Sequence, residues 1–293
     1  MSNPKIAVVT DSAAYIPQQA LGDFDIPVIP LWLLWDDDSY RDGVDIDPPT
    51  FYQRLRTSKT FPSSSQPSRG EFVDFFKKVS AEADAIVAVM VTSKISGTFA
   101  NAVAAQEQLP DLNIRVVDSH SVTMGQGFAV LAAARAAAAG KSLDEVVAAA
   151  KHVCDNVELI FAVDTLEFLH RGGRLGGGAR FLGTALKLKP LLYFVDGQIE
   201  ALTKVRTKRK AVARMLDIVE EWLDGKRMAE VAVADVDTSK EGDALAQQIK
   251  ERFGVSTVHR TTVSPVIGTH AGPGTVCITY YPELEFFATH GTN

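Results

Sequence analysis

The chain has 293 residues, of which 36 are acidic and 30 basic, so its formal net charge is −6. Hydrophobic residues make up 46% and charged residues 23%, an average globular composition that excludes wholesale disorder, a coiled coil and a collagen-like chain. The acidic balance and the lack of a long Lys/Arg block argue against a nucleic-acid partner, because binding to a phosphate backbone needs clustered positive charge.

The sequence shows no sign of membrane insertion or export. The uncharged apolar run at residues 85–91 is far shorter than the roughly 20 residues of a membrane span, and the N-terminal residues lack an apolar signal segment. Cys154 and Cys277 stand far apart without CxxC spacing, so we expect buried thiols and neither a zinc site nor a disulfide framework. These features predict a cytoplasmic protein with no integral membrane segment.

Strand and helix patterns alternate through the first half of the chain, which predicts a parallel sheet covered by helices. In chain order we expect strands at residues 5–10 and 26–34, an acidic segment at 36–47, a helix starting at Pro48 and Pro49, a helix around residues 72–79, a strand at 85–91, a helix at 97–108, a strand at 114–117, an Ala-rich helix at 125–139 closed by Gly140, and a helix at 143–153.

The second half reads as a mixed sheet. We expect a strand at residues 159–163, a hairpin of strands 191–195 and 199–204 joined at Asp196 and Gly197, a helix at 208–223, a strand at 230–234, a helix at 242–253, and strands at 255–261 and 275–281. The predicted fold is therefore α/β with two domains: an N-terminal parallel-sheet domain at residues 1–156 and a C-terminal mixed-sheet domain at 157–293.

Clusters of Ser, Thr, Asp and His side chains follow several of the predicted strands. In an open α/β sheet, ligands bind at the carboxyl ends of strands, where loops and helix N-termini converge. Ser96 and Gly97 at a predicted helix start could hold an anion, although a hydroxyl there is more often a helix cap. Ser64 can also belong to a solvated loop that precedes the helix around residues 72–79. His270 lies in a Gly-Pro-Gly loop, and a lone histidine is more often structural than catalytic.

The common catalytic patterns fail when they are tested. The sequence has no G-x-S-x-G elbow, no complete G-x-G-x-x-G and no HExxH pair, and the glycines Gly178 and Gly183 with Thr184 have phosphate-loop spacing but lack its lysine. Asp235 and Asp237 alone are a weak metal signal. We therefore expect no catalytic residue, no metal and no cofactor, and an anion as the guest.

Six short motifs, in fixed order through most of the chain, resemble the DegV family of bacterial fatty-acid-binding proteins, the carrier subunits of fatty acid kinase. The sequence motifs are VTDS at residues 9–12, SQPS at 65–68, SGTF at 96–99, VDS at 117–119 with MGQG at 124–127, GGRL at 172–175 with KP at 189–190, and HAGPG at 270–274.

The resemblance implies a carrier without catalysis of its own, which holds one long-chain fatty acid in the cleft between its two domains. It presents this ligand to a separate fatty acid kinase in phospholipid synthesis. Ser64 takes the threonine position of the family's TSQPS motif and keeps its hydroxyl. Ser96 matches the serine that binds the carboxylate, His270 matches the histidine of the family's HxGPG loop, and Arg174 matches the arginine implicated in working with the kinase. Beside Ser96, the Gly97 amide is expected to help fix the head group. Two alternatives stay open: a serine hydrolase using Ser96 and His270, and a phosphate or sugar-phosphate enzyme using the loop at residues 172–178.

Overall fold

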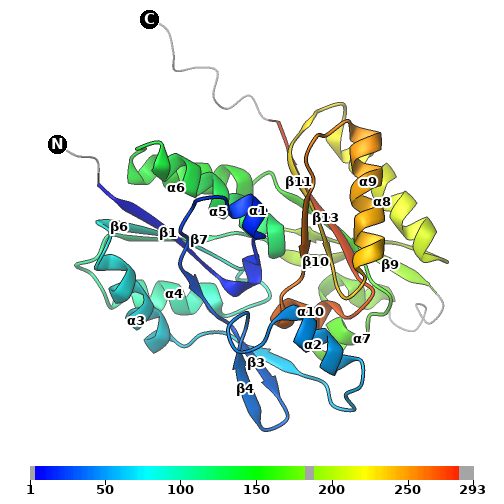
Figure 1. Ribbon diagram of the computed structural model, residues 1–293, viewed down its shortest axis with the longest axis horizontal. Coiled ribbons are helices and arrows are strands. Elements are labelled where there is room, and N and C mark those ends of the chain that lie inside the picture. The colour runs from blue at the N-terminus through cyan, green and yellow to red at the C-terminus, as the bar shows by residue number, and fades with distance from the viewer. Residues whose placement is uncertain (1–3, 182–187, 284–293) are drawn as a thin grey trace, which may run out of the picture.

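The structure is a computed structural model that describes residues 4–181 and 188–283. Two sheets lie side by side, and a small third sheet with helix α2 lies below the line where they meet (Figure 1). The first sheet is parallel, and its order is β2 (Val28–Ile29), β1 (Ile6–Asp11), β6 (Ala85–Met90) and β7 (Ile114–Asp118).

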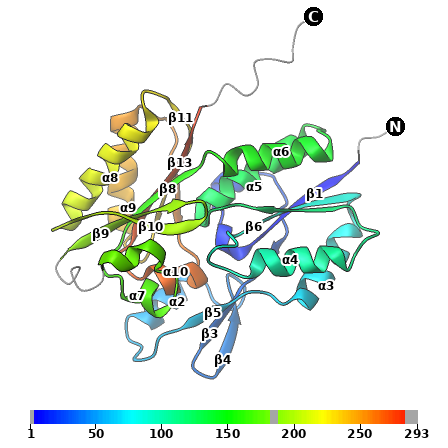
Figure 2. The same cartoon turned by 180° about the vertical axis from the view of Figure 1, so that it is seen from behind.

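Helices cover both faces of the parallel sheet (Figure 2). Because successive strand residues point to opposite faces, Val8 and Val87 pack on one helix pair while Val9 and Ala88 pack on the other. The first pair is α5 (Thr123–Ala138) and α6 (Leu143–Cys154), and the second is α3 (Arg69–Ser80) and α4 (Thr98–Glu107).

The second sheet is mixed, as predicted. Its order is β10 (Gln198–Val205), β9 (Lys189–Val195), β8 (Glu158–Ala162), β13 (Val276–Pro282), β11 (Met228–Asp235) and β12 (His259–Thr262). Only the β11–β12 pair is parallel among the pairs that the described residues form. One face packs against α8 (Lys208–Leu223) and α9 (Ser239–Phe253), and the other turns toward the first sheet.

The α/β prediction and most of the predicted elements are confirmed. Asp196 and Gly197, both with positive φ, form the turn between β9 and β10, and Gly140 follows α5 in a left-handed conformation. Cys154 and Cys277 are free and buried. The domain boundary at residues 156/157 stays a prediction. Among the described residues, no helix combines the length and the apolarity needed to cross a membrane.

The single strand predicted at residues 26–34 was wrong. Pro30 has no amide hydrogen for a sheet ladder, and the segment divides there into β2, in the parallel sheet, and β3 (Trp32–Trp35), in the small sheet. The acidic segment after it contributes β4 (Asp38–Arg41), which pairs with β3. The small sheet is completed by β5 (Ser63–Ser65), and α2 (Pro48–Leu55) begins at its two prolines as expected.

Short elements were missed or misplaced. The strand predicted at 255–261 occurs later and is shorter, at His259–Thr262, because Gly254 closes α9 in a left-handed conformation and the next residues form a loop. The sequence reading also missed α7 (Glu167–Arg171) and α10 (Pro265–Ala271), as well as α1 (Gln18–Leu21) and the 3₁₀ turns Ser12–Ala14 and Gly176–Phe181.

Candidate functional site

A narrow apolar slot lies between the parallel sheet, the mixed sheet and the small sheet. The empty space between its walls is about 750 Å³, counting the part open to solvent, and about 80 Å³ of it is wide enough for the centre of a water molecule. Both halves of the chain supply its apolar wall, including Leu31, Val91, Phe161, Phe194 and Val266. The polar residues in the wall are Ser64, Ser96, Thr123, Arg174, His270 and Thr275.

Ser64 and His270 meet in the wall of this slot. The Ser64 hydroxyl on β5 lies 2.6 Å from His270 Nε2, and the tautomer of the ring decides which group donates. Burial and, secondarily, the Arg174 guanidinium lower the pKa of His270 to about 4. The imidazole is therefore neutral near pH 7 and can hydrogen-bond an anion without a buried positive charge of its own.

The sequence predicted that His270 lies in a Gly-Pro-Gly loop. The structure instead places it in the last turn of α10. The Ser264 side chain caps this helix and Pro265 occupies its first turn, so a Ser-Pro pair starts a short helix in a segment with no strong periodicity. Gly272 follows at φ 76 and ends the helix. The helix end thus places the imidazole, and the glycines after it serve the turn.

Ser96 lies beside the start of α4. Its hydroxyl is 2.8 Å from Thr98 Oγ1, and Gly97 is the N-cap of that helix without a side-chain cap. Gly97 is next to the slot but is not one of its lining residues. A Cβ at Gly97 would come within 2.9 Å of Gln66 Nε2, so the glycine lets the SQPS segment pack onto this helix start. The role of the Gly97 amide stays a prediction.

The Arg174 side chain lines the slot and donates hydrogen bonds to two backbone carbonyls. Its Nε donates to the Ile95 carbonyl at 3.1 Å and its Nη1 to the Gly172 carbonyl at 2.5 Å. A Cβ at Gly172 would lie 2.1 Å from His270 Nδ1, so only glycine leaves room for the imidazole. The GGR segment therefore supports the Ser64–His270 pair and adds one positive charge beside it. Its role toward a kinase stays a prediction.

Two buried carboxylates hold the backbone of the slot wall from behind. Asp11 Oδ2 accepts from the Val91 amide at 2.7 Å, and Asp42 Oδ1 accepts from the Val266 amide at 3.2 Å. Asp42 Oδ2 also accepts from the Ser12 hydroxyl at 2.7 Å. Burial raises the pKa of both Asp11 and Asp42 to about 6. From the sequence, Asp11 was identified only as a polar residue at a strand end, and Asp42 was not predicted to have a role.

The hydrolase alternative, as predicted with Ser96 and His270, is not favoured by this geometry. His270 bonds Ser64, while the Ser96 hydroxyl bonds Thr98. His270 Nδ1 has no hydrogen-bond partner among the described residues, so no carboxylate orients the ring as a base requires. A pKa near 4 also makes this histidine a weak general base at neutral pH.

The glycine loop at residues 172–178 is not suited to a phosphate. A Cβ at Gly176 would come within 2.4 Å of the Ile199 carbonyl oxygen, and one at Gly177 within 1.8 Å of Glu200 Oε2. These glycines allow close packing on β10, and the Glu200 carboxylate beside them repels an anion. Gly183 and Thr184, the rest of the phosphate-loop spacing, lie outside the described residues.

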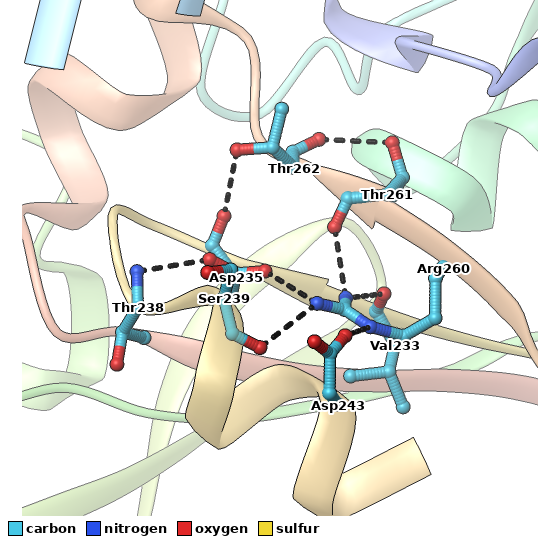
Figure 3. Close-up of polar contacts among 8 residues, drawn as sticks. All are labelled: Val233, Asp235, Thr238, Ser239, Asp243, Arg260, Thr261 and Thr262. Carbon is cyan, nitrogen blue, oxygen red and sulfur yellow. Dashed lines mark hydrogen bonds and ion pairs between the residues drawn. The ribbon is translucent and has the colours of Figure 1, made fainter. Parts of the chain in front are cut away.

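The acidic end of β11 is occupied by ion pairs. Figure 3 shows the Arg260 guanidinium between the carboxylates of Asp235 and Asp243, at 2.8 Å and 2.9 Å. Asp237 pairs with Arg56, the C-cap residue of α2. Within residues 4–181 and 188–283, no group of three or more His, Cys, Asp or Glu side chains could hold a metal ion. Arg260 on β12 thus ties the end of β11 to α9.

Known proteins match this chain along nearly its whole length. A DegV domain-containing protein of Listeria monocytogenes is 36% identical over 279 residues, covering 95% of this chain and 99% of that protein. The protein DegV of Bacillus subtilis is 32% identical and covers 93% of this chain and 98% of its own.

Solved structures match the fold as well. A structure from Thermus thermophilus, described as fatty acid binding of a DegV family protein, has a TM-score of 0.89 at 33% identity and covers 95% of this chain and all of its own. A second, described as DegV, a fatty acid binding protein from Bacillus subtilis, has a TM-score of 0.87 at 31% identity, with 96% of this chain and all of its own covered. The family model "Uncharacterised protein, DegV family" matches residues 5–283. This chain therefore belongs to the DegV family.

Proposed function

We propose that this chain binds one long-chain fatty acid in the slot and presents its carboxylate to a separate fatty acid kinase, which forms the acyl phosphate in phospholipid synthesis. The observation that carries the proposal is the combination in one pocket of an apolar slot and a Ser64–His270 pair with Ser96 and Arg174 beside it. The fatty-acid-binding relatives from Thermus thermophilus and Bacillus subtilis support it.

The apolar slot and the polar residues Ser64 and Ser96 would contribute to fatty acid binding in different ways. Burying about 15 methylenes contributes on the order of 12 kcal/mol, at roughly 0.8 kcal/mol each, before the entropy of binding is subtracted. The carboxylate would lose several kcal/mol on burial without partners, and each hydrogen bond to it recovers roughly 1.5–3 kcal/mol. In this account the acyl tail supplies affinity, and the hydroxyls of Ser64 and Ser96 fix the head group.

We infer that the chain is a carrier and performs no catalysis. Titration of the full chain with hexadecanoic acid tests the binding, and a fluorophosphonate probe tests the alternative of a nucleophilic serine. We expect saturable binding at about one equivalent and no covalent adduct. An adduct at Ser64 or Ser96 that hexadecanoic acid blocks would instead support a hydrolase.

A substitution of Arg174 should distinguish presentation of the carboxylate to the kinase from binding of the fatty acid. The Arg174 side chain lines the slot, and its positive charge is close enough to lower the pKa of His270, so it suits a developing acyl phosphate. We expect Arg174→Gln to lower kinase-dependent acyl phosphate formation at saturating fatty acid by at least about 10-fold, the size of one lost charge-assisted contact. Hydroxylamine trapping with a fatty acid kinase and ATP measures this. Full formation by the variant at saturation would remove Arg174 from the presentation step.

A further inference from the structure

The slot runs along the β8–β13 pair toward the first turn of α5. Thr275 marks the His270 end, because its hydroxyl donates to the Ala271 carbonyl at 2.9 Å. Cys277 and its partner Phe161 line the slot next, followed by Leu159, which pairs with Thr279. At about 3.3 Å per residue, Thr275 and Thr279 are separated by about 13 Å along the strand.

The first turn of α5 closes that end of the slot. A Cβ at Gly125 would be 3.5 Å from the Thr279 methyl carbon and 2.0 Å from Ser121 Oγ, so the glycine lets this turn pack tightly against β13. Val122 and Thr123 from the same turn line the slot. The α5 end of the slot therefore lies well away from His270 along β13.

This end holds polar groups without partners. Thr123 is 4% exposed, and its hydroxyl makes no hydrogen bond to any described residue. The buried Ser121 hydroxyl behind it is unpaired in the same way. The N-cap residue of this helix of 16 residues is Val122, which offers no side-chain cap to the first amides. Thr123 also has φ 50, a costly conformation for a β-branched residue that packing must hold in place.

We propose that Thr123 and the amide end of α5 form a polar subsite for a hydroxyl group on the acyl chain of the ligand. This inference rests on the proposed function, since the acyl chain must occupy the slot. A ligand hydroxyl both donates and accepts, so it can bond the Thr123 hydroxyl and accept from a free helix amide. A plain hydrocarbon leaves these buried groups unpaired, which is unfavourable. The slot should therefore select chains hydroxylated at the depth of Thr123.

The test is competition binding on the full chain. It compares octadecanoic acid with a series of monohydroxy-octadecanoic acids that differ in the position of the hydroxyl. We expect one position in the distal part of the chain to bind about 3- to 10-fold more tightly than the unsubstituted acid, the effect of one net hydrogen bond. Thr123→Val should abolish this preference, and Thr123→Ser, which restores a hydroxyl, should keep it. Thr275→Val is the matched control, because that hydroxyl lines the same slot but is already bonded, and the preference should persist.

Two outcomes overturn the inference and are distinguishable. If octadecanoic acid binds and every isomer binds equally or more weakly, the subsite is wrong while fatty acid binding stands. If neither the plain nor any hydroxylated acid binds, the proposed function fails and the subsite fails with it. A preference that survives in Thr123→Val would also remove Thr123 from the subsite.

Discussion

Replacing Ser64 by alanine is expected to weaken fatty acid binding by about 10- to 100-fold. The hydroxyl lies in the slot wall, 2.6 Å from His270 Nε2, where it can bond the carboxylate and orient the imidazole together. A hydrogen bond to a charged group contributes roughly 1.5–3 kcal/mol, which converts to this range of affinity. Displacement of a fluorescent fatty acid measures the change.

The same strand offers matched controls for this prediction. Ser65, the next residue on β5, does not line the slot, and its hydroxyl makes only a long contact to the Gln66 carbonyl at 3.4 Å. Ser65→Ala should therefore change affinity by less than about 2-fold, as expected for a substitution without a buried partner. Ser64→Thr keeps the hydroxyl and should retain binding. Equal affinities for Ser64→Ala and Ser65→Ala would show that Ser64 does not contact the head group.

Removing the Asp42 carboxyl should cost about 2–6 kcal/mol of folding free energy. Asp42 lies between β4 and α10 and accepts from the Ser12 hydroxyl and the Val266 amide, both buried. Asp42→Ala leaves these donors unpaired, at about 1–3 kcal/mol each. Asp42→Asn keeps an oxygen for the Val266 amide and is the matched control. Urea unfolding at pH 5 compares the two; equal losses for both would show that the carboxamide does not replace these bonds.

The pH dependence of stability follows from the same group. Because burial raises the pKa of Asp42 from 3.8 to about 6, protonation favours the folded state. Its contribution to stability is complete below about pH 4 and is lost as the pH rises through about 6. Asp42→Asn should flatten this fall in part, since the pKa of Asp11 is raised to about 6 as well. An unchanged pH profile in the variant would exclude Asp42 as a titrating group.

Local sequence patterns allowed the main elements of both sheets to be predicted from the sequence. Residues 85–91 were predicted as a strand because an unbroken apolar run of this length is typical of a strand buried on both faces, and β6 is buried throughout. The turn at Asp196 and Gly197 was predictable because only a few residue pairs adopt positive φ in succession. Such elements depend on neighbouring residues in the chain, so a single sequence is enough to predict them.

The missed features depend on contacts between distant residues. Pro30 divides β2 from β3, but tertiary contacts decide that the two strands join separate sheets. The helix that carries His270 is short, and its position depends in part on Asp42, 224 residues earlier in the chain, which accepts from the Val266 amide. Arg174 was expected to face a partner, and its bond to the Ile95 carbonyl is likewise long-range. No spacing rule brings these residues together before the chain folds.

Mass spectrometry of the natively purified full chain, denatured and extracted with organic solvent, tests the central claim most directly. The account predicts about one equivalent of long-chain fatty acid per chain in the extract, because the apolar slot retains its ligand through purification. Ser64→Ala should release a larger share of it under the same washing. An extract free of fatty acid, together with no saturable uptake of added hexadecanoic acid, would contradict the claim.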